Sequence, residues 1–134
     1  MAELQIPGIE VEYAFSITMN FAERIDFVGP RRGKGYVPPA SGTVYGPLLN
    51  GRVVPYSGAD FAIFREVSQG IKANTHYMLQ ADDGTWIYIN NRGYLNRSPD
   101  PANPGQTKLY FRMTPMFEAP AGPHEWLART MIVG

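Results

Sequence analysis

The sequence contains no cysteine, which excludes disulfide bonds, thiolate metal sites and a cysteine nucleophile. It also lacks an excess of either charge, because twelve lysines and arginines balance twelve aspartates and glutamates. A chain without net charge has no field that would draw it onto nucleic acid or an anionic membrane. We therefore expect neither of these as a partner, and favour a small molecule.

Long apolar runs are missing as well. No segment approaches the roughly 18 apolar residues that a membrane-spanning helix needs. The first residues, MAELQIPGIE, lack the basic start and apolar stretch of a secretory signal. We expect a cytoplasmic protein, and at 134 residues the chain has the length of one domain.

Motifs for nucleotides and metals are absent too. No glycine-rich phosphate loop and no dinucleotide fingerprint occurs, so no cofactor is expected. The two histidines, His76 and His124, are far apart and lack a matched carboxylate spacing, so no metal site is expected. We interpret the basic run at residues 31–34 as a solvated loop rather than as a phosphate-binding site. The sequence leaves open whether this loop or His76 takes part in function.

Glycine and proline, in contrast, are abundant. Fourteen glycines and twelve prolines are spread along the chain and leave few windows long enough for a helix. Residues 11–21, VEYAFSITMNF, alternate apolar and small or polar side chains and predict a strand. Further strands are expected at residues 41–45, 51–55, 60–67, 71–81, 85–92, 108–117 and 125–133. Residues 68–70 are predicted to turn, and residues 96–107 to form a surface loop.

This pattern predicts an all-β fold. Strands at such spacing, with little or no helix, are typical of a closed barrel or a sandwich. We expect residues 1–134 to form a single small antiparallel β-barrel, calycin-like or lipocalin-like, of about eight strands. A homodimer or larger homo-oligomer is left open.

The clearest hairpin surrounds Asp83 and Gly84. If these two residues form a two-residue turn, Leu79 lies opposite Tyr88 and Tyr77 lies opposite Asn90. One face then combines Ala81, Leu79, Tyr77 and Thr75 with Trp86, Tyr88, Asn90 and Arg92. Such a face resembles a pocket wall with an apolar floor and a polar mouth. The alternative is an amphipathic hairpin whose rings pack while their polar tips reach water.

Two other stretches supply candidate functional residues. Tyr110, Arg112 and Thr114 alternate with apolar residues, so their row faces either solvent or a lumen. Asp60 lies between a glycine-rich turn and an apolar strand, where a carboxylate must remain hydrated or accept a hydrogen bond. Its alternative role is that of a turn residue or cap.

Five motifs resemble one known family, the DUF3237 (UPF0311-type) family of small all-β proteins of unknown function. They are SGTVYGPLLNGRVVP, SGADF, THYMLQADDGTWIYINNRG, YFRMTPMFE and EWLARTMIVG, in the family's order. The resemblance covers the chain from about Tyr13 to Gly134. It implies a β-barrel architecture and no established activity.

The resemblance also marks positions that members tend to share. They are Gly42, Gly46, Gly51, Asp60, Tyr77, Asp83, Gly84, Tyr88, Arg92, Gly93, Phe111, Arg112, Phe117 and Leu127. Two departures are Phe61, where tryptophan is common, and Ala128, where asparagine is common. The second puts in doubt any site to which that asparagine contributes.

These observations lead to a candidate site. Catalytic roles are assigned to Asp60, Tyr77, Arg92 and Arg112, because an acid, a phenol and two guanidiniums can transfer protons and bind an anion or enolate. Substrate contacts are assigned to Tyr88, Trp86, Asn90, Tyr110, Tyr45 and Phe15.

Three functions fit such a barrel. The favoured one is a cofactor-independent cyclase, isomerase or lyase of secondary metabolism that acts on an apolar, oxygen-bearing aromatic or polyketide-like molecule. The second is a non-catalytic carrier of the same kind of molecule. The third is a structural protein whose barrel is filled by its own side chains.

Overall fold

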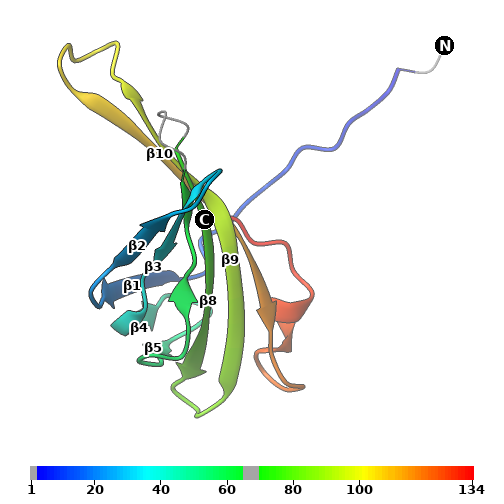
Figure 1. Cartoon of the computed structure of the whole chain (residues 1–134). Coiled ribbons are helices and arrows are strands. Elements are labelled where there is room, and N and C mark those ends of the chain that lie inside the picture. The colour runs from blue at the N-terminus through cyan, green and yellow to red at the C-terminus, as the bar shows by residue number, and fades with distance from the viewer. Residues whose placement is uncertain (1–2, 65–69) are drawn as a thin grey trace.

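A computed structural model describes residues 3–64 and 70–134 (Figure 1). This part of the chain forms ten strands in one antiparallel sheet. The strands are β1 (Ser16–Phe21), β2 (Ile25–Val28), β3 (Gly33–Tyr36), β4 (Pro39–Tyr45), β5 (Gly51–Val53), β6 (Ala59–Asp60), β7 (Ile63–Phe64), β8 (Ile71–Ala81), β9 (Trp86–Pro99) and β10 (Thr107–Glu118). A short 3-10 helix, η1 (Glu125–Ala128), follows. The all-β expectation is confirmed.

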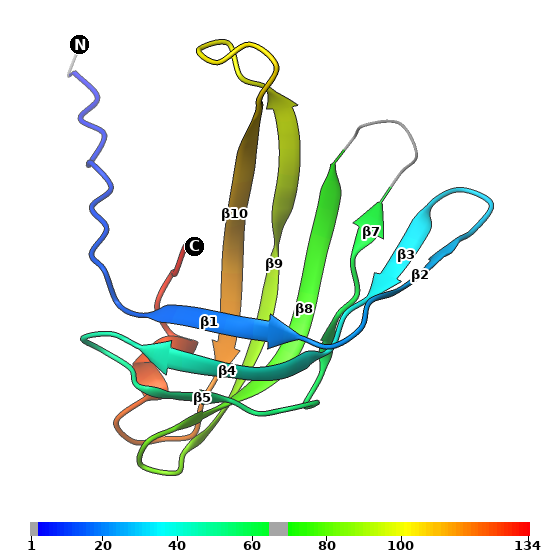
Figure 2. The ribbon, with the colours of Figure 1, turned by 90° about the vertical axis from the view of Figure 1, so that its left-hand side faces the viewer.

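The sheet is organised around β8. On one side β8 pairs with β9, which pairs with β10; on the other side its length is divided between β5, β6 and β7. From β5 the sheet continues through β4 to β1, and from β7 through β3 to β2. Figure 2 shows this division, with β1, β4 and β5 curling across the long strands.

The sheet curves like a barrel without closing. Within the described residues, no ladder joins β1 to β10, so an open seam remains between these two strands. The open sheet differs in this respect from the closed barrel that the spacing of the predicted strands suggested. The amino-terminal arm, residues 10–15, and the last residues of the chain, 130–134, lie along this seam.

The predicted register of the β8–β9 hairpin is wrong by one residue. Leu79 lies opposite Ile87, and Met78 lies opposite Tyr88. The turn has three residues rather than two, because the N–H of Ala81 donates to the carbonyl of Thr85 at 2.9 Å. Gly84 has a φ of +88°, the left-handed conformation that closes such a loop.

The corrected register separates two faces that the prediction had mixed. Residues directly opposite in an antiparallel pair share a face. Tyr77, Leu79, Ile87 and Ile89 therefore share the concave face, and each is at most 3% exposed. We call this the inner face. The convex outer face carries the residues that alternate with them, among them Asn74, His76, Met78, Gln80, Trp86, Tyr88, Asn90 and Arg92.

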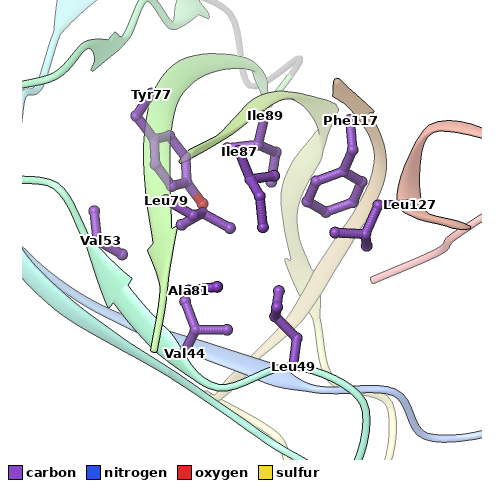
Figure 3. Close-up of a cluster of buried hydrophobic side chains, with 10 residues drawn as sticks. All are labelled: Val44, Leu49, Val53, Tyr77, Leu79, Ala81, Ile87, Ile89, Phe117 and Leu127. Carbon is purple, nitrogen blue, oxygen red and sulfur yellow. The ribbon is translucent and has the colours of Figure 1, made fainter. Parts of the chain in front are cut away.

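The core fills the inner face. Figure 3 shows side chains from β4, β5, β8, β9, β10 and η1 converging there. Val44, Val53, Leu79 and Ile87 are each at most 2% exposed, and full burial of one such side chain contributes about 1.5–3 kcal/mol. The floor of the open seam is therefore part of the core.

Two strand predictions and one loop prediction also change in the structure. The strand expected from residue 11 begins at Ser16. The strand expected at residues 60–67 is replaced by the separate β6 and β7, and residues 65–69 lie outside the described part, as does most of the predicted turn at residues 68–70. The loop expected at residues 96–107 shortens to residues 100–106, because β9 and β10 pair out to Pro99 and Thr107.

The strand expected at residues 125–133 does not form. Residues 125–128 wind into η1, and Leu127 is its buried residue. Ladder-like pairing occurs only at the end of this segment, where Gly134 and Met113 exchange backbone hydrogen bonds of 2.8 and 2.9 Å. Trp126, Leu127 and Ile132 pack onto the core, whereas Met131 and Val133 are exposed.

Candidate functional site

A cleft of about 730 Å³ follows the open seam. One wall comes from residues 10–17, which include the start of β1. The opposite wall comes from β9 and β10, and residues 130–134 close one side. A volume of this size lies within the range of small-molecule sites.

The floor of the cleft is apolar. The rings of Phe15 and Phe117 meet edge to face, with centroids 6.0 Å apart, across the seam between the arm and β10. Ile89, Ile17 and Trp126 extend this surface. Since these side chains pack against the buried cluster, the floor is supported from below by the core. The arrangement favours flat or bulky apolar groups.

Asn91 places an amide in this apolar floor. Its side chain lines the cleft, and its Oδ1 is buried without a hydrogen-bond partner in the described part of the chain. An unpaired buried acceptor costs about 1–3 kcal/mol. A guest with a hydroxyl or N–H group would supply the missing donor.

The ladder aligns further polar groups beside Asn91. Asp60 on β6 lies opposite Thr75 on β8, and Thr75 lies opposite Asn91 on β9. Thr75 is buried, at 7% exposure. Strands are spaced by about 4.8 Å, so the backbone of Asp60 is about 10 Å from that of Asn91.

Asp60 has a structural role in this row. Its Oδ1 accepts a hydrogen bond of 3.0 Å from the backbone N–H of Asn74. The ladder between β6 and β8 ends at Asp60. Its carboxylate therefore accepts the hydrogen bond of the Asn74 N–H, which a longer β6 would otherwise have paired. This contact agrees with the capping alternative that the sequence raised.

Tyr77 on β8 lies opposite Ile89 on β9, two residues along the ladder from the pair of Thr75 and Asn91. The side chain is 3% exposed, and burial raises the pKa of its phenol well above the ordinary value. The group therefore stays protonated at neutral pH and can donate a hydrogen bond. In Figure 3 its ring points in among the other labelled core side chains.

The rim of the cleft is polar. The hydroxyls of Tyr13 and Ser16 share a hydrogen bond of 2.8 Å, which holds the arm at the point where it joins β1. Glu10 and Glu12 extend along the arm above them. The cleft thus changes from an apolar floor to a polar, acidic mouth.

The structure does not bring the four predicted catalytic residues together. Tyr77 faces inward, whereas Arg92 and Arg112 are exposed on the outer face. The guanidinium of Arg112 lies 5.7 Å from the centroid of the Tyr110 ring and donates to the carbonyl of Phe111 at 2.8 Å. Both arginines are separated from the cleft by the thickness of the sheet.

The six predicted substrate contacts are divided in the same way. Phe15 lines the cleft. Trp86, Tyr88, Asn90 and Tyr110 lie on the outer face, and Tyr45 is 45% exposed opposite Ser16.

Sequence reasoning missed most of the cleft. Asn91, Ile89, Phe117, Trp126 and Ile132 line it and were not proposed as contacts. The signal that could have found Asn91 is the pair of adjacent asparagines at residues 90 and 91, since an amide on each side of one strand must include one that faces inward.

Two observations concern ions and membranes. In residues 3–64 and 70–134, no three histidine, aspartate or glutamate side chains gather closely enough to hold a metal ion. Across the same ranges, no helix has the length and hydropathy for a membrane crossing.

Comparisons with known proteins find a matching family and relatives in sequence and structure. The family described as "Protein of unknown function (DUF3237)" matches residues 9–134. A UPF0311 protein of Clostridium acetobutylicum is 30% identical over 140 residues, which cover 96% of this chain and 85% of that protein.

Solved structures share the architecture. A conserved protein of unknown function from Rhodopseudomonas palustris is 28% identical, with a TM-score of 0.83 over 96% of this chain and 89% of that chain. A β-barrel-like protein from Acinetobacter baumannii is 24% identical, with a TM-score of 0.72 over 89% and 86% of the two chains. At that lower identity the likeness is one of fold alone.

Proposed function

Because the chain belongs to the DUF3237 family, whose function is unknown, we propose from its own residues that it binds an apolar, oxygen-bearing small molecule in the cleft between β1 and β10. The guest is an aromatic or polyketide-like molecule with at least one hydroxyl group. The observation that carries this proposal is the unpaired, buried Oδ1 of Asn91 within an apolar cleft of about 730 Å³.

The contacts define the expected guest. The Phe15 and Phe117 rings suit an aromatic or alicyclic body. The amide oxygen of Asn91 can only accept a hydrogen bond, so the guest must donate one. The rim at Glu10 and Glu12 disfavours a guest with a negative charge at that end.

A matched pair of probes tests this proposal. 1-Naphthol and naphthalene have the same apolar body, and only the first has a hydroxyl donor. We expect the wild-type protein to bind 1-naphthol roughly tenfold more tightly, because one hydrogen bond to a buried acceptor is worth about 1–1.5 kcal/mol. Quenching of Trp126 fluorescence provides the readout, with Trp86 as the second fluorophore.

Two variants locate the effect. Asn91→Leu keeps the volume of the side chain and removes the amide, so it should abolish the preference for 1-naphthol while naphthalene still binds. Asn96→Leu, an exposed asparagine of the same strand, is the control and should keep the preference. Equal affinities of the two probes for the wild-type protein would contradict the proposal.

Proton-transfer catalysis is the second candidate function, and Tyr77 favours it. Tyr77 lies behind the lining of the cleft, opposite Ile89, which lines it. A protonated phenol that reaches a guest there can donate to a developing oxyanion. We propose that the protein, if catalytic, is a cofactor-independent isomerase, cyclase or lyase. A carrier would need the same cleft, but it would not need the phenol of Tyr77 as a hydrogen-bond donor.

Conversion assays separate catalyst from carrier. Candidate phenols and polyketide-like lactones that bind the wild-type protein are incubated with it and with Tyr77→Phe and Asp60→Asn variants. Retained affinity with lost conversion in Tyr77→Phe would support catalysis. Conversion that is unchanged by Asp60→Asn would leave Asp60 with its structural contact alone, and tight binding without any conversion would support the carrier.

A further inference from the structure

The outer face of the β8–β9 hairpin carries a second cluster of polar side chains. The Tyr88 hydroxyl lies 2.6 Å from Nδ1 of His76, and Nε2 of His76 lies 2.9 Å from Oδ1 of Asn74. All three residues are half-buried. They form a continuous hydrogen-bonded line that the cleft does not include.

The chemistry of the three groups fixes the direction of the hydrogen bonds. An amide oxygen accepts and never donates, so Nε2 of His76 carries the hydrogen. In the neutral imidazole, Nδ1 then has the free lone pair, and the Tyr88 hydroxyl donates to it. A base that contacts a nucleophilic hydroxyl and is oriented by a third group is the arrangement that activates hydroxyls in enzymes.

Asn74 is itself held in place. Its backbone N–H donates to Oδ1 of Asp60 at 3.0 Å. Asp60 is thus a positioning residue for the outer cluster, and it acts on His76 through Asn74. This contact gives a reason for the carboxylate at this position that is independent of the cleft.

An acceptor and a cation flank the line of Tyr88, His76 and Asn74. Asn90 lies opposite His76, and its Oδ1, buried without a partner in the described residues, can accept a hydrogen bond from a ligand hydroxyl. Arg92 lies opposite Asn74, with an exposed side chain. Other ionisable groups on this face include Lys72, Arg52, Lys108, Arg112 and Glu118, of which Glu118 lies directly opposite Tyr88.

We propose that Tyr88, with His76 as its base, is a proton-transfer site on the outer face for a ligand that carries a phenolic or enolic hydroxyl. The Tyr88 O–H bond breaks as an N–H bond forms at Nδ1 of His76. The phenolate oxygen then takes the proton of the ligand hydroxyl, and Arg92 pairs with the ligand anion. No electrons are exchanged with an oxidant or reductant, and the site does not depend on the cleft proposed above.

An aryl sulfonyl fluoride tests the activation of Tyr88. This reagent transfers its sulfonyl group to a tyrosine oxygen and releases fluoride and the phenolic proton, which His76 would accept. We expect Tyr88 in the full chain to be modified faster than the more exposed Tyr56, Tyr94 and Tyr110, as read by peptide mass spectrometry. His76→Gln should slow the modification of Tyr88 by about a hundredfold, the lower end of the range for a general base.

The other histidine supplies the control. His124→Gln removes an imidazole that contacts Asp83, far from Tyr88 in the sequence, and should leave the labelling of Tyr88 unchanged. Labelling of Tyr88 that is slower than that of Tyr56 would overturn the proposal, as would equal rates in wild type and His76→Gln.

A spectroscopic measurement keeps the proposal testable if His76→Gln does not fold. Nitrogen-15 chemical shifts of the wild-type imidazole should identify His76 as the tautomer with hydrogen on Nε2. A hydrogen on Nδ1 would mean that His76 donates to Tyr88, and the proposed direction of proton transfer would then be wrong.

The proposed pairing of Arg92 with the ligand anion is tested with 4-nitrophenol. Its absorbance distinguishes phenol from phenolate, and binding beside a guanidinium should lower the pKa of the probe. We expect Arg92→Gln to remove this shift and Arg97→Gln, a second exposed arginine of β9, to keep it. A probe whose titration is the same with and without protein would contradict the role of Arg92. 4-Nitrophenol also fits the guest expected in the cleft, so the titration is repeated in Asn91→Leu. A shift that persists in Asn91→Leu and is lost in Arg92→Gln belongs to the outer site, which makes failure here and failure of the cleft proposal distinguishable.

Discussion

His124 donates a hydrogen bond of 2.8 Å from Nε2 to Oδ2 of Asp83. The contact joins the tip of the β8–β9 hairpin to the residue that precedes η1. The hairpin and the C-terminal segment both contribute to the cleft, so this pair fixes one part of the site relative to another.

The Asp83 contact predicts a dependence of stability on acid pH. The backbone N–H of Thr85, then its side chain, then His124 lower the pKa of Asp83 from 3.8 to about 2. A carboxylate with a lowered pKa stabilises the fold fully above its unfolded pKa and loses this effect as pH falls through the folded one. The melting temperature should therefore drop between about pH 4 and about pH 2, as measured by circular dichroism.

Two variants isolate this effect. Asp83→Asn keeps an oxygen that can accept from Thr85 but has no charge to titrate, so its melting temperature should fall less over the same window. Asp82→Asn, at the neighbouring exposed position, should follow the wild-type curve. Identical pH profiles for Asp83→Asn and wild type would show that the contact contributes nothing.

Gly84 should tolerate substitution better than Gly51. An added Cβ at Gly84 would meet nothing within 4 Å, so alanine there costs only the left-handed backbone at φ +88°, about 1–2 kcal/mol. At Gly51 the Cβ would lie 2.2 Å from the carbonyl oxygen of Gln80, and the β5–β8 ladder would have to separate. We expect urea unfolding to show a larger loss for Gly51→Ala, and the reverse order would contradict this account.

A matched pair of isoleucines tests the core. Ile87 is 0% exposed, whereas Ile25 on the edge strand β2 is 58% exposed. Ile87→Ala should destabilise the protein by about 2–5 kcal/mol, and Ile25→Ala should change the free energy of unfolding by no more than about 0.5 kcal/mol. Similar losses for the two variants in urea titrations would mean that β2 is covered in solution.

Tyr77 predicts a dependence on alkaline pH. Burial raises the pKa of its phenol, so the folded state keeps the proton when the unfolded chain loses it. Stability is fully present below the ordinary tyrosine pKa of about 10 and falls as pH rises above it.

Tyr77→Phe has no proton to lose and should lose less stability above about pH 10 than the wild-type protein. Tyr56→Phe, at a position that is 68% exposed, should retain the wild-type profile. Thermal melts across that range provide the measurement, and an unchanged alkaline profile for Tyr77→Phe would show that the phenol is hydrated in the folded state.

The hairpin shows what the sequence can and cannot predict. Period-two alternation correctly placed Trp86, Tyr88, Asn90 and Arg92 on one face, because that periodicity is a property of a single strand. The partners of that face depend on the length of the turn. The Asp-Gly pair is typical of a two-residue turn, and the third loop residue, Asp82, moved the register by one.

This one-residue change also explains why the predicted site divided. With the expected register, Tyr77 and Arg92 would share a face. With the observed register, Tyr77 joins the buried apolar face and Arg92 joins the outer one. The cleft could not be foreseen for a different reason: it depends on the meeting of Phe15 and Phe117 across more than a hundred residues of chain, and no local pattern encodes this contact.

The seam between β1 and β10 bears on which guests the cleft can select. A fully closed barrel limits both the width and the length of the molecule it encloses. A slit that opens along the side of the lumen restricts girth while leaving the ends of a guest free to protrude. Selectivity should then follow the cross-section of the ring system that is held between Phe15 and Phe117, and substituents at the far end of the guest should matter little.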